Sequence, residues 1–175
     1  MEDQKSSSKQ IMLNYGLMLG FISILISVAN YAVGDIYKPH WAVSVVSIIA
    51  TIAVIVLGIK KVKELNNGFL TLGEALKTGL GIALVSGILF LIYFFVFTNF
   101  IESEFYARSL EVKEQAVLEM YPNLTDEQLE GAMDMQKKLN GPLFTSAILL
   151  IVSLFFGFIV ALIAGLVMKN VKDED

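Results

Sequence analysis

LFTSAILLIVSLFFGFIVALIAGLVM, residues 143–168, decides the fold, because no charged side chain interrupts it. A helix rises about 1.5 Å per residue and the hydrocarbon core of a bilayer is about 30 Å thick, so roughly 20 residues span it. Residues 11–33, 41–59 and 78–100 form three more uncharged stretches. Four such runs would leave a soluble protein too little polar surface to cover them, so we expect four membrane-spanning helices.

The composition agrees with an all-α, polytopic membrane protein built as a single domain over residues 1–175. Charged residues make up 17% of the chain, below the roughly 25% of a typical soluble domain. The net charge of −4 gives no basic patch for a nucleic-acid partner. The absence of cysteine excludes disulfides, thiolate metal sites and cysteine nucleophiles.

Lysines in the short connections predict the orientation, because basic residues near span ends are retained in the cytoplasm. They lie before the first span, between the second and third spans, and after the fourth span, at Lys5, Lys9, Lys60, Lys61, Lys63, Lys77, Lys169 and Lys172. We therefore expect both chain ends on the cytoplasmic side. Tyr31, Tyr37 and Trp41 are expected in an aromatic belt at the outer surface.

The third helix should begin outside the lipid core. Thr71 and Glu74 have the spacing of a capping box, in which a hydroxyl and a carboxylate bond the first free backbone amides. The helix is expected over residues 72–100, so the four expected spans are 11–33, 41–59, 72–100 and 143–168.

The outer loop, residues 101–140, predicts two amphipathic helices that form an extracytoplasmic cap. Pro122 should separate them, and Thr125 with Gln128 has the capping-box spacing for the second. Their apolar faces can pack on each other or on the membrane surface, or they can bind a partner.

Small residues recur at four-residue spacing in three of the spans, where they allow close helix contact in lipid. We expect these stripes to face other helices of the bundle or of an oligomer. They are Ser153, Gly157, Ala161 and Gly165, then Gly79, Ala83 and Gly87, and finally Gly16 and Gly20.

Candidate functional groups are few. None of the four uncharged runs holds an ionisable group of the kind that transporters keep in the membrane, and no catalytic, metal-binding or cofactor-binding motif occurs, so an enzyme is not expected. Glu74 and Lys77 are the first candidates for a functional surface, with helix-start electrostatics as the alternative role. His40 is expected to be an interfacial polar residue, and Glu102 and Glu104 could contact a cation at the head groups.

Several segments resemble a bacterial family known as domain of unknown function 4199. They are NGFLTLGEALKTG at residues 67–79, NFIESEF at 99–105, TDEQLE at 125–130 and MDM at 133–135. The chain departs from the family pattern at Glu102, where many members have an aspartate–proline pair, and this bears on how the outer helix starts. The resemblance implies a small four-span inner-membrane protein of Gram-negative bacteria, and it supplies no activity, substrate or catalytic residue.

Two classes of function remain open. The first is a non-enzymatic assembly or accessory protein whose partners are the lipid bilayer and a second copy or another envelope membrane protein. The second is a pore or transporter for a small solute, suggested by hydroxyl side chains in the spans and by similar lysine-rich segments after the second and fourth spans at residues 60–64 and 169–173.

Overall fold

The computed structural model describes residues 2–171, with side chains from residue 7 onward, and all of its regular elements are helices. Four of them are long and apolar enough to cross a membrane, as the uncharged runs predict. In chain order the elements are α1 (Glu2–Val33), α2 (Trp41–Leu65), α3 (Leu72–Val96), the π-helix η1 (Phe97–Ile101), α4 (Phe105–Met120), α5 (Asp126–Leu139) and α6 (Pro142–Met168).

The helices are longer than the uncharged runs that predict them. Helix α2 continues through Lys60 to Leu65, and α1 begins at Glu2 instead of residue 11. Lysine and glutamate are good helix formers, so a helix continues into water when hydropathy falls. Uncharged length therefore marks the segment suited to lipid and underestimates the helix.

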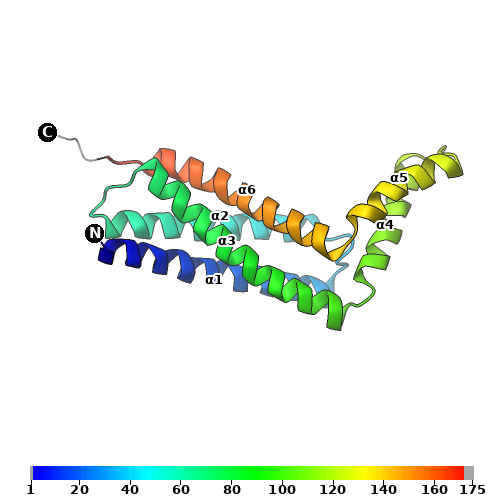
Figure 1. Cartoon of the computed structure of the whole chain (residues 1–175), viewed down its shortest axis with the longest axis horizontal. Helices are drawn as coiled ribbons and strands as arrows, with labels where there is room; N and C mark the ends of the chain where they lie inside the picture. Colours follow the sequence, from blue (N-terminus) through cyan, green and yellow to red (C-terminus); the bar gives the residue numbers. More distant parts are fainter. Residues whose placement is uncertain (1, 172–175) are drawn as a thin grey trace.

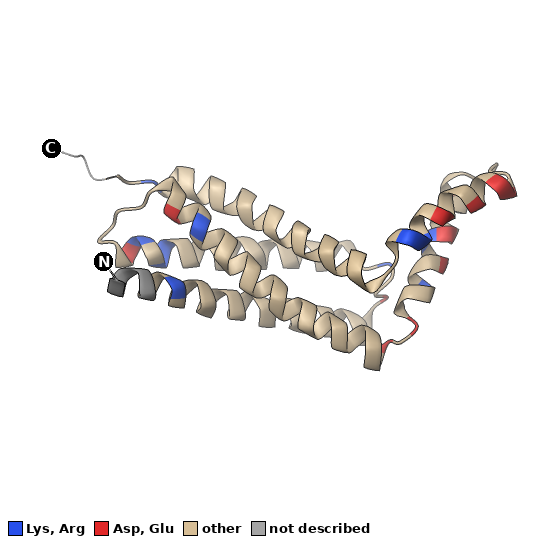
Figure 2. Cartoon of the chain, viewed as in Figure 1, with Lys and Arg blue, Asp and Glu red and all other residues tan. Residues whose placement is uncertain are grey.

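The four long helices form a bundle in which α3 lies between α1 and α6, and α2 contacts all three (Figure 1). The described lysines of the first segment, of the α2–α3 connection and of the segment after α6 gather where the chain begins and ends (Figure 2), whereas Lys38 lies in the turn between α1 and α2 at the opposite end. We call the end with the gathered lysines the lysine end, and the opposite end, where α4 and α5 lie, the hairpin end. The side chain of Lys5 and the whole of Lys172, which the orientation argument also uses, lie outside the described part of the chain.

The core lies in the half of the bundle nearest the lysine end. Ile55 and Ile59 of α2, Ile82 of α3 and Ala161 of α6 have no exposed surface. The cluster that they form includes one residue of the connection between α2 and α3, Leu70, which is also fully buried.

Two backbone features close the lysine end. Asn67 and Gly68 have positive φ values of 55° and 88°, a conformation that asparagine and glycine adopt most easily, and they end α2 as the Gly68 amide bonds to the Lys63 carbonyl at 2.9 Å. Leu70 then pairs with Asn170 in an antiparallel bridge, with N–O distances of 2.7 and 3.0 Å. The segment after α6 is thereby attached to the connection between α2 and α3.

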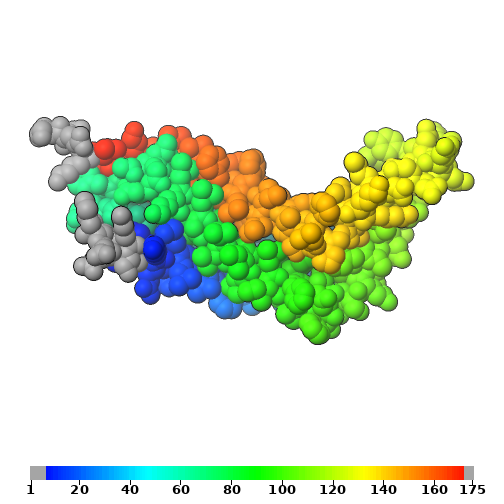
Figure 3. All heavy atoms as spheres, viewed as in Figure 1, coloured from blue at the N-terminus to red at the C-terminus, as the bar shows by residue number. Residues whose placement is uncertain are grey.

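Helices α4 and α5 form an antiparallel hairpin that stands out from the bundle (Figures 1 and 3). Thr125 and Gln128 make the expected capping box at the start of α5, and α4 ends at Met120, before Pro122. Met133 is the one hairpin residue that is buried within the described chain. The apolar side chains of Met120, Tyr121 and Met135 are mostly exposed.

Candidate functional site

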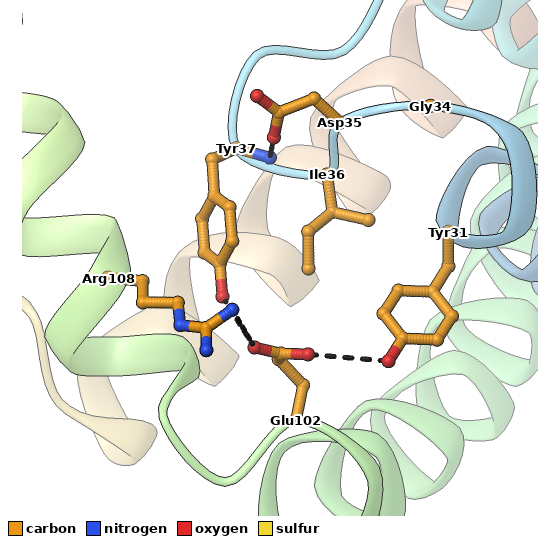
Figure 4. A pocket seen from close by; sticks show the side chains of 7 residues that line it. All are labelled: Tyr31, Gly34, Asp35, Ile36, Tyr37, Glu102 and Arg108. Atoms are coloured by element: carbon orange, nitrogen blue, oxygen red, sulfur yellow. Dashed lines mark hydrogen bonds and ion pairs between the residues drawn. The ribbon is translucent and has the colours of Figure 1, made fainter.

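A polar contact that joins three segments of the chain surrounds Glu102, at the hairpin end. The last turn of the α3 segment is a π-helix, and it ends as the Glu102 amide bonds to the Phe97 carbonyl at 2.8 Å. A π-helix admits one extra residue per turn and is frequent at functional sites. Here it places the Glu102 side chain beside the turn between α1 and α2 (Figure 4).

Three segments supply partners to the Glu102 carboxylate. Tyr31, at the end of α1, donates its hydroxyl at 3.3 Å, and Tyr37, in the turn that follows, donates its hydroxyl at 3.1 Å. Arg108 of α4 forms an ion pair with the carboxylate at 3.3 Å. We call Tyr31, Tyr37, Glu102 and Arg108 the Glu102 cluster.

The cluster lines an open pocket of about 320 Å³, completed by Gly34, Asp35 and Ile36. Asp35 shapes the turn that carries Tyr37, because its carboxylate accepts hydrogen bonds from the backbone amides of Tyr37 and Lys38 at 2.8 and 3.3 Å. Each polar side chain that lines the pocket therefore already has a partner within the chain.

The electrostatics of the cluster favour a neutral tyrosine beside a charged pair. Burial, followed by the hydrogen bond to Glu102 and the negative charge of Glu102, raises the pKa of Tyr37 from 10 to about 12. The pKa of Arg108 is also raised, first by its hydrogen bond to Glu104 and then by the charges of Glu102 and Glu104. Tyr37 is thus a hydrogen-bond donor, and Arg108 a permanent cation, at neutral pH.

Aromatic rings surround the polar contact. Phe105 stacks on Tyr37 with centroids 5.8 Å apart and meets Phe94 edge-on at 5.4 Å. Tyr31 meets Phe97 edge-on at 5.1 Å. Such pairs are each worth about 0.5–1.5 kcal/mol beyond their buried area, so the base of α4 is held by apolar as well as polar contacts.

The first candidates for a functional surface from the sequence, Glu74 and Lys77, lie at the lysine end. Glu74 completes the capping box with Thr71 at the lysine end, and its carboxylate also accepts a hydrogen bond from the Asn66 side chain at 3.0 Å. Lys77, one turn further along α3, is exposed. The structure does not bring either residue to the pocket.

The small-residue stripes of α3 and α6 face each other. A Cβ added at Gly157 would lie 2.5 Å from the Cβ of Ala83, and one at Gly165 would lie 2.8 Å from the Cβ of Ala75. Gly79 approaches Ala161 closely in the same way. The backbones of α3 and α6 therefore approach so closely that these sites have no room for a side chain.

Toward the hairpin end, the stripe of α3 continues at Gly87, where its contact with α6 is less close. Helix α1 contacts α3 through a separate pair of glycines. A Cβ at Gly87 would lie 2.9 Å from Leu150 and 3.4 Å from the hydroxyl of Ser153. On α1, Gly16 and Gly20 lie against Val85 and Leu89 of α3. Every member of the three stripes therefore lies at a contact between helices of one chain.

Tyr31, Tyr37 and Arg108 are not predictable as a site from the sequence, because tyrosines at span ends are typical of the interfacial belt and Arg108 reads as part of a solvated face. The available signal is topological: the turn between α1 and α2 and the exit from α3 must lie at the same end. Among the described residues, no group of three or more histidine, aspartate or glutamate side chains could hold a metal ion. What the geometry of the cluster shows is a connection between three segments of the chain: α1 with its following turn, the exit from α3, and α4.

Comparison with known proteins gives a family without an activity. No curated protein and no solved structure matches the chain. A family model described as "protein of unknown function (DUF4199)" matches residues 14–170. This match runs from within α1 to just past α6 and so covers almost the whole chain, including the hairpin, and it confirms the resemblance noted in the sequence. The chain therefore belongs to the DUF4199 family.

Proposed function

We propose that this protein is a non-enzymatic accessory component of the bacterial inner membrane that assembles with a second copy or with another envelope membrane protein. The observation that carries the proposal is the surface of the hairpin. Met120 and Met135 are 68% and 69% exposed, and Tyr121 is 57% exposed. Methionine and tyrosine are typical of adaptable binding surfaces.

The proposed orientation places the lysine end in the cytoplasm and the hairpin outside. The proposal is supported by the six described lysines of the lysine end, because short basic loops tend to stay in the cytoplasm. These lysines are Lys9, Lys60, Lys61, Lys63, Lys77 and Lys169. The hairpin segment is longer and rich in acidic residues, so it is less governed by that rule.

Assembly is tested by crosslinking in native membranes followed by capture of the tagged protein. We expect a crosslinked product whose yield falls when Met120 and Met135 are both replaced by serine. The control replaces Glu119 and Lys138, two exposed polar residues of the same helices, by serine. It should leave the yield of crosslinked product unchanged. A protein that stays monomeric and free of partners in native membranes would contradict the proposal.

The orientation is tested by thiol labelling, which is simple because the chain contains no cysteine. Single variants Lys61→Cys and Lys137→Cys are treated in intact spheroplasts with a reagent that does not cross membranes. Only Lys137→Cys should react. Labelling of Lys61→Cys before lysis would reverse the proposed topology.

The alternative class, a pore or transporter for a small solute, needs a polar path between the helices. The buried polar side chains of the described residues are Thr78, Ser86 and Thr98, and Thr78 and Thr98 each donate to a carbonyl of the preceding turn. The closed core at the lysine end supports the accessory role instead. Solute flux in proteoliposomes, absent from empty vesicles, would favour the alternative.

A further inference from the structure

Helices α4 and α5 of the hairpin contact each other independently of their contacts with the bundle. Asn140, at the end of α5, donates its side-chain amide to the Tyr106 carbonyl and accepts a hydrogen bond from Lys113 at 2.9 Å. Met133 is buried. Helices α4 and α5 thus share contacts at their base, so a change in the direction of α4 should carry α5 with it.

The Glu102 cluster is the polar attachment between this hairpin and the bundle. The side chain of Glu102 is only 13% exposed, and a carboxylate withdrawn from water is costly unless it is paired. Its two tyrosine donors come from α1 and the adjacent turn, and its cation comes from α4. The direction of α4 relative to the bundle is therefore coupled to the Glu102–Arg108 contact.

Arg108 has a second carboxylate within reach. Its guanidinium bonds to Glu104, one turn earlier and on the hairpin side, at 2.9 Å. If Arg108 leaves Glu102, it keeps this ion pair, and Glu102 keeps the hydroxyls of Tyr31 and Tyr37. Neither charge is left without a partner, which lowers the cost of separating the hairpin from the bundle.

We propose that Arg108 is a releasable latch: shared between Glu102 and Glu104 it holds the hairpin in one orientation, and held by Glu104 alone it lets the hairpin move relative to the bundle. The polar groups of the pocket already bond one another, so we assign the pocket this conformational role. The inference rests on the proposed function only in that a moving hairpin would change how a partner surface is presented.

The test measures the orientation directly, without any partner. Spin labels on Ser44→Cys at the start of α2 and Lys138→Cys on α5, both exposed positions, report one distance in the protein reconstituted in lipid nanodiscs. The parent should give a single narrow distance. Glu102→Gln and Arg108→Gln should each broaden or shift it, since both remove the ion pair across the attachment.

Glu104→Gln is the matched control and has the opposite expectation. It removes the competing carboxylate, so the distance should stay as narrow as in the parent, or become narrower. Arg108 is half exposed, so Arg108→Gln keeps the test decisive if Glu102→Gln fails to fold. An unchanged distance in Arg108→Gln, or equal broadening in Glu104→Gln, overturns the latch.

Partner capture is read separately with the same variants. A shifted distance with unchanged crosslinking keeps the latch and removes its link to assembly. An unchanged distance with lost crosslinking removes the latch and leaves the proposed function standing.

Discussion

The two halves of the bundle have the same apolar character but differ in packing. Helix α2 buries Val54, Ile55, Gly58, Ile59 and Val62, all toward the lysine end, whereas none of its residues from Trp41 to Ala53 is buried. Helix α6 behaves alike, since its buried residues begin at Gly157. Beyond Gly87 of α3, the buried residues toward the hairpin end of the bundle are Phe97 and Thr98, beside the Glu102 cluster.

The difference shows that, in a membrane protein, the hydropathy of a segment does not determine how closely that segment packs. Lipid tails are as apolar as leucine, so an apolar side chain gains little from leaving lipid for a neighbouring helix. Contact then depends on how closely backbones approach. In α3 and α6 the glycines and alanines that permit close approach lie toward the lysine end, and the core lies there too.

The largest expected effect comes from filling the closest helix contact. Gly157→Ile combined with Gly165→Ile should separate α6 from α3, because each overpacked site costs about 1–3 kcal/mol or more. Size-exclusion chromatography in mild detergent should show an expanded or aggregated protein. The controls Gly73→Ala and Gly131→Ala, where an added Cβ meets nothing within 4 Å, should elute as the parent does.

A matched pair on one helix separates the two halves next. Ile59 is fully buried and Ile49 is 60% exposed. Ile59→Ala should lower the free energy of unfolding toward the lower end of the about 2–5 kcal/mol seen for buried isoleucine. Ile49→Ala should change it by less than about 0.5 kcal/mol, as for an exposed site. Unfolding in SDS measures both free energies. Equal losses of unfolding free energy in the two variants would show that Ile49 is packed against another side chain when the protein is in lipid.

The two capping boxes provide a smaller contrast. Thr71→Ala removes the cap of α3 at the packed end and should cost about 1 kcal/mol of global stability. Thr125→Ala removes the same cap from α5 but should fray only the hairpin, because α5 buries a single residue. Hydrogen exchange distinguishes the results. Backbone amides of the core should exchange faster in Thr71→Ala and should keep their protection in Thr125→Ala. Loss of core protection in Thr125→Ala would contradict this.

The smallest effect tests the Glu102 cluster at the hairpin end. Tyr37 should titrate near pH 12 instead of 10, as followed by NMR of labelled tyrosine with Tyr37→Phe to assign the signal. The pKa is raised in the folded state, so the stabilising effect of the protonated hydroxyl is complete below about pH 10 and lost as the pH rises through about 12.

Glu102→Gln sharpens that measurement. The pKa of Tyr37 should fall but stay above 10, because burial, its largest cause, remains. A Tyr37 pKa that does not move in Glu102→Gln would show that the two side chains are not in contact in the membrane.

The helices and their order could be predicted from the sequence because lipid demands long uncharged runs. The capping boxes at Thr71 and Thr125 were equally readable, since a cap depends on residues three positions apart. The Glu102 cluster was not, because Tyr31 and Glu102 are 71 residues apart and their meeting depends on the tilt of α3 against α1 and on a π-turn. Neither property leaves a periodic pattern in the chain.

The facing stripes of α3 and α6 also constrain biogenesis. Ribosomes deliver the chain from its first residue, so α3 enters the membrane while the whole hairpin and α6 are still unmade. Until α6 arrives, Gly79 and Ala83 lack the Ala161 and Gly157 that later face them, and Leu70 lacks the Asn170 backbone with which it later pairs. The nascent protein must therefore pass through a three-helix stage with an uncovered glycine face, and a premature stop before Gly157 would leave it permanently there.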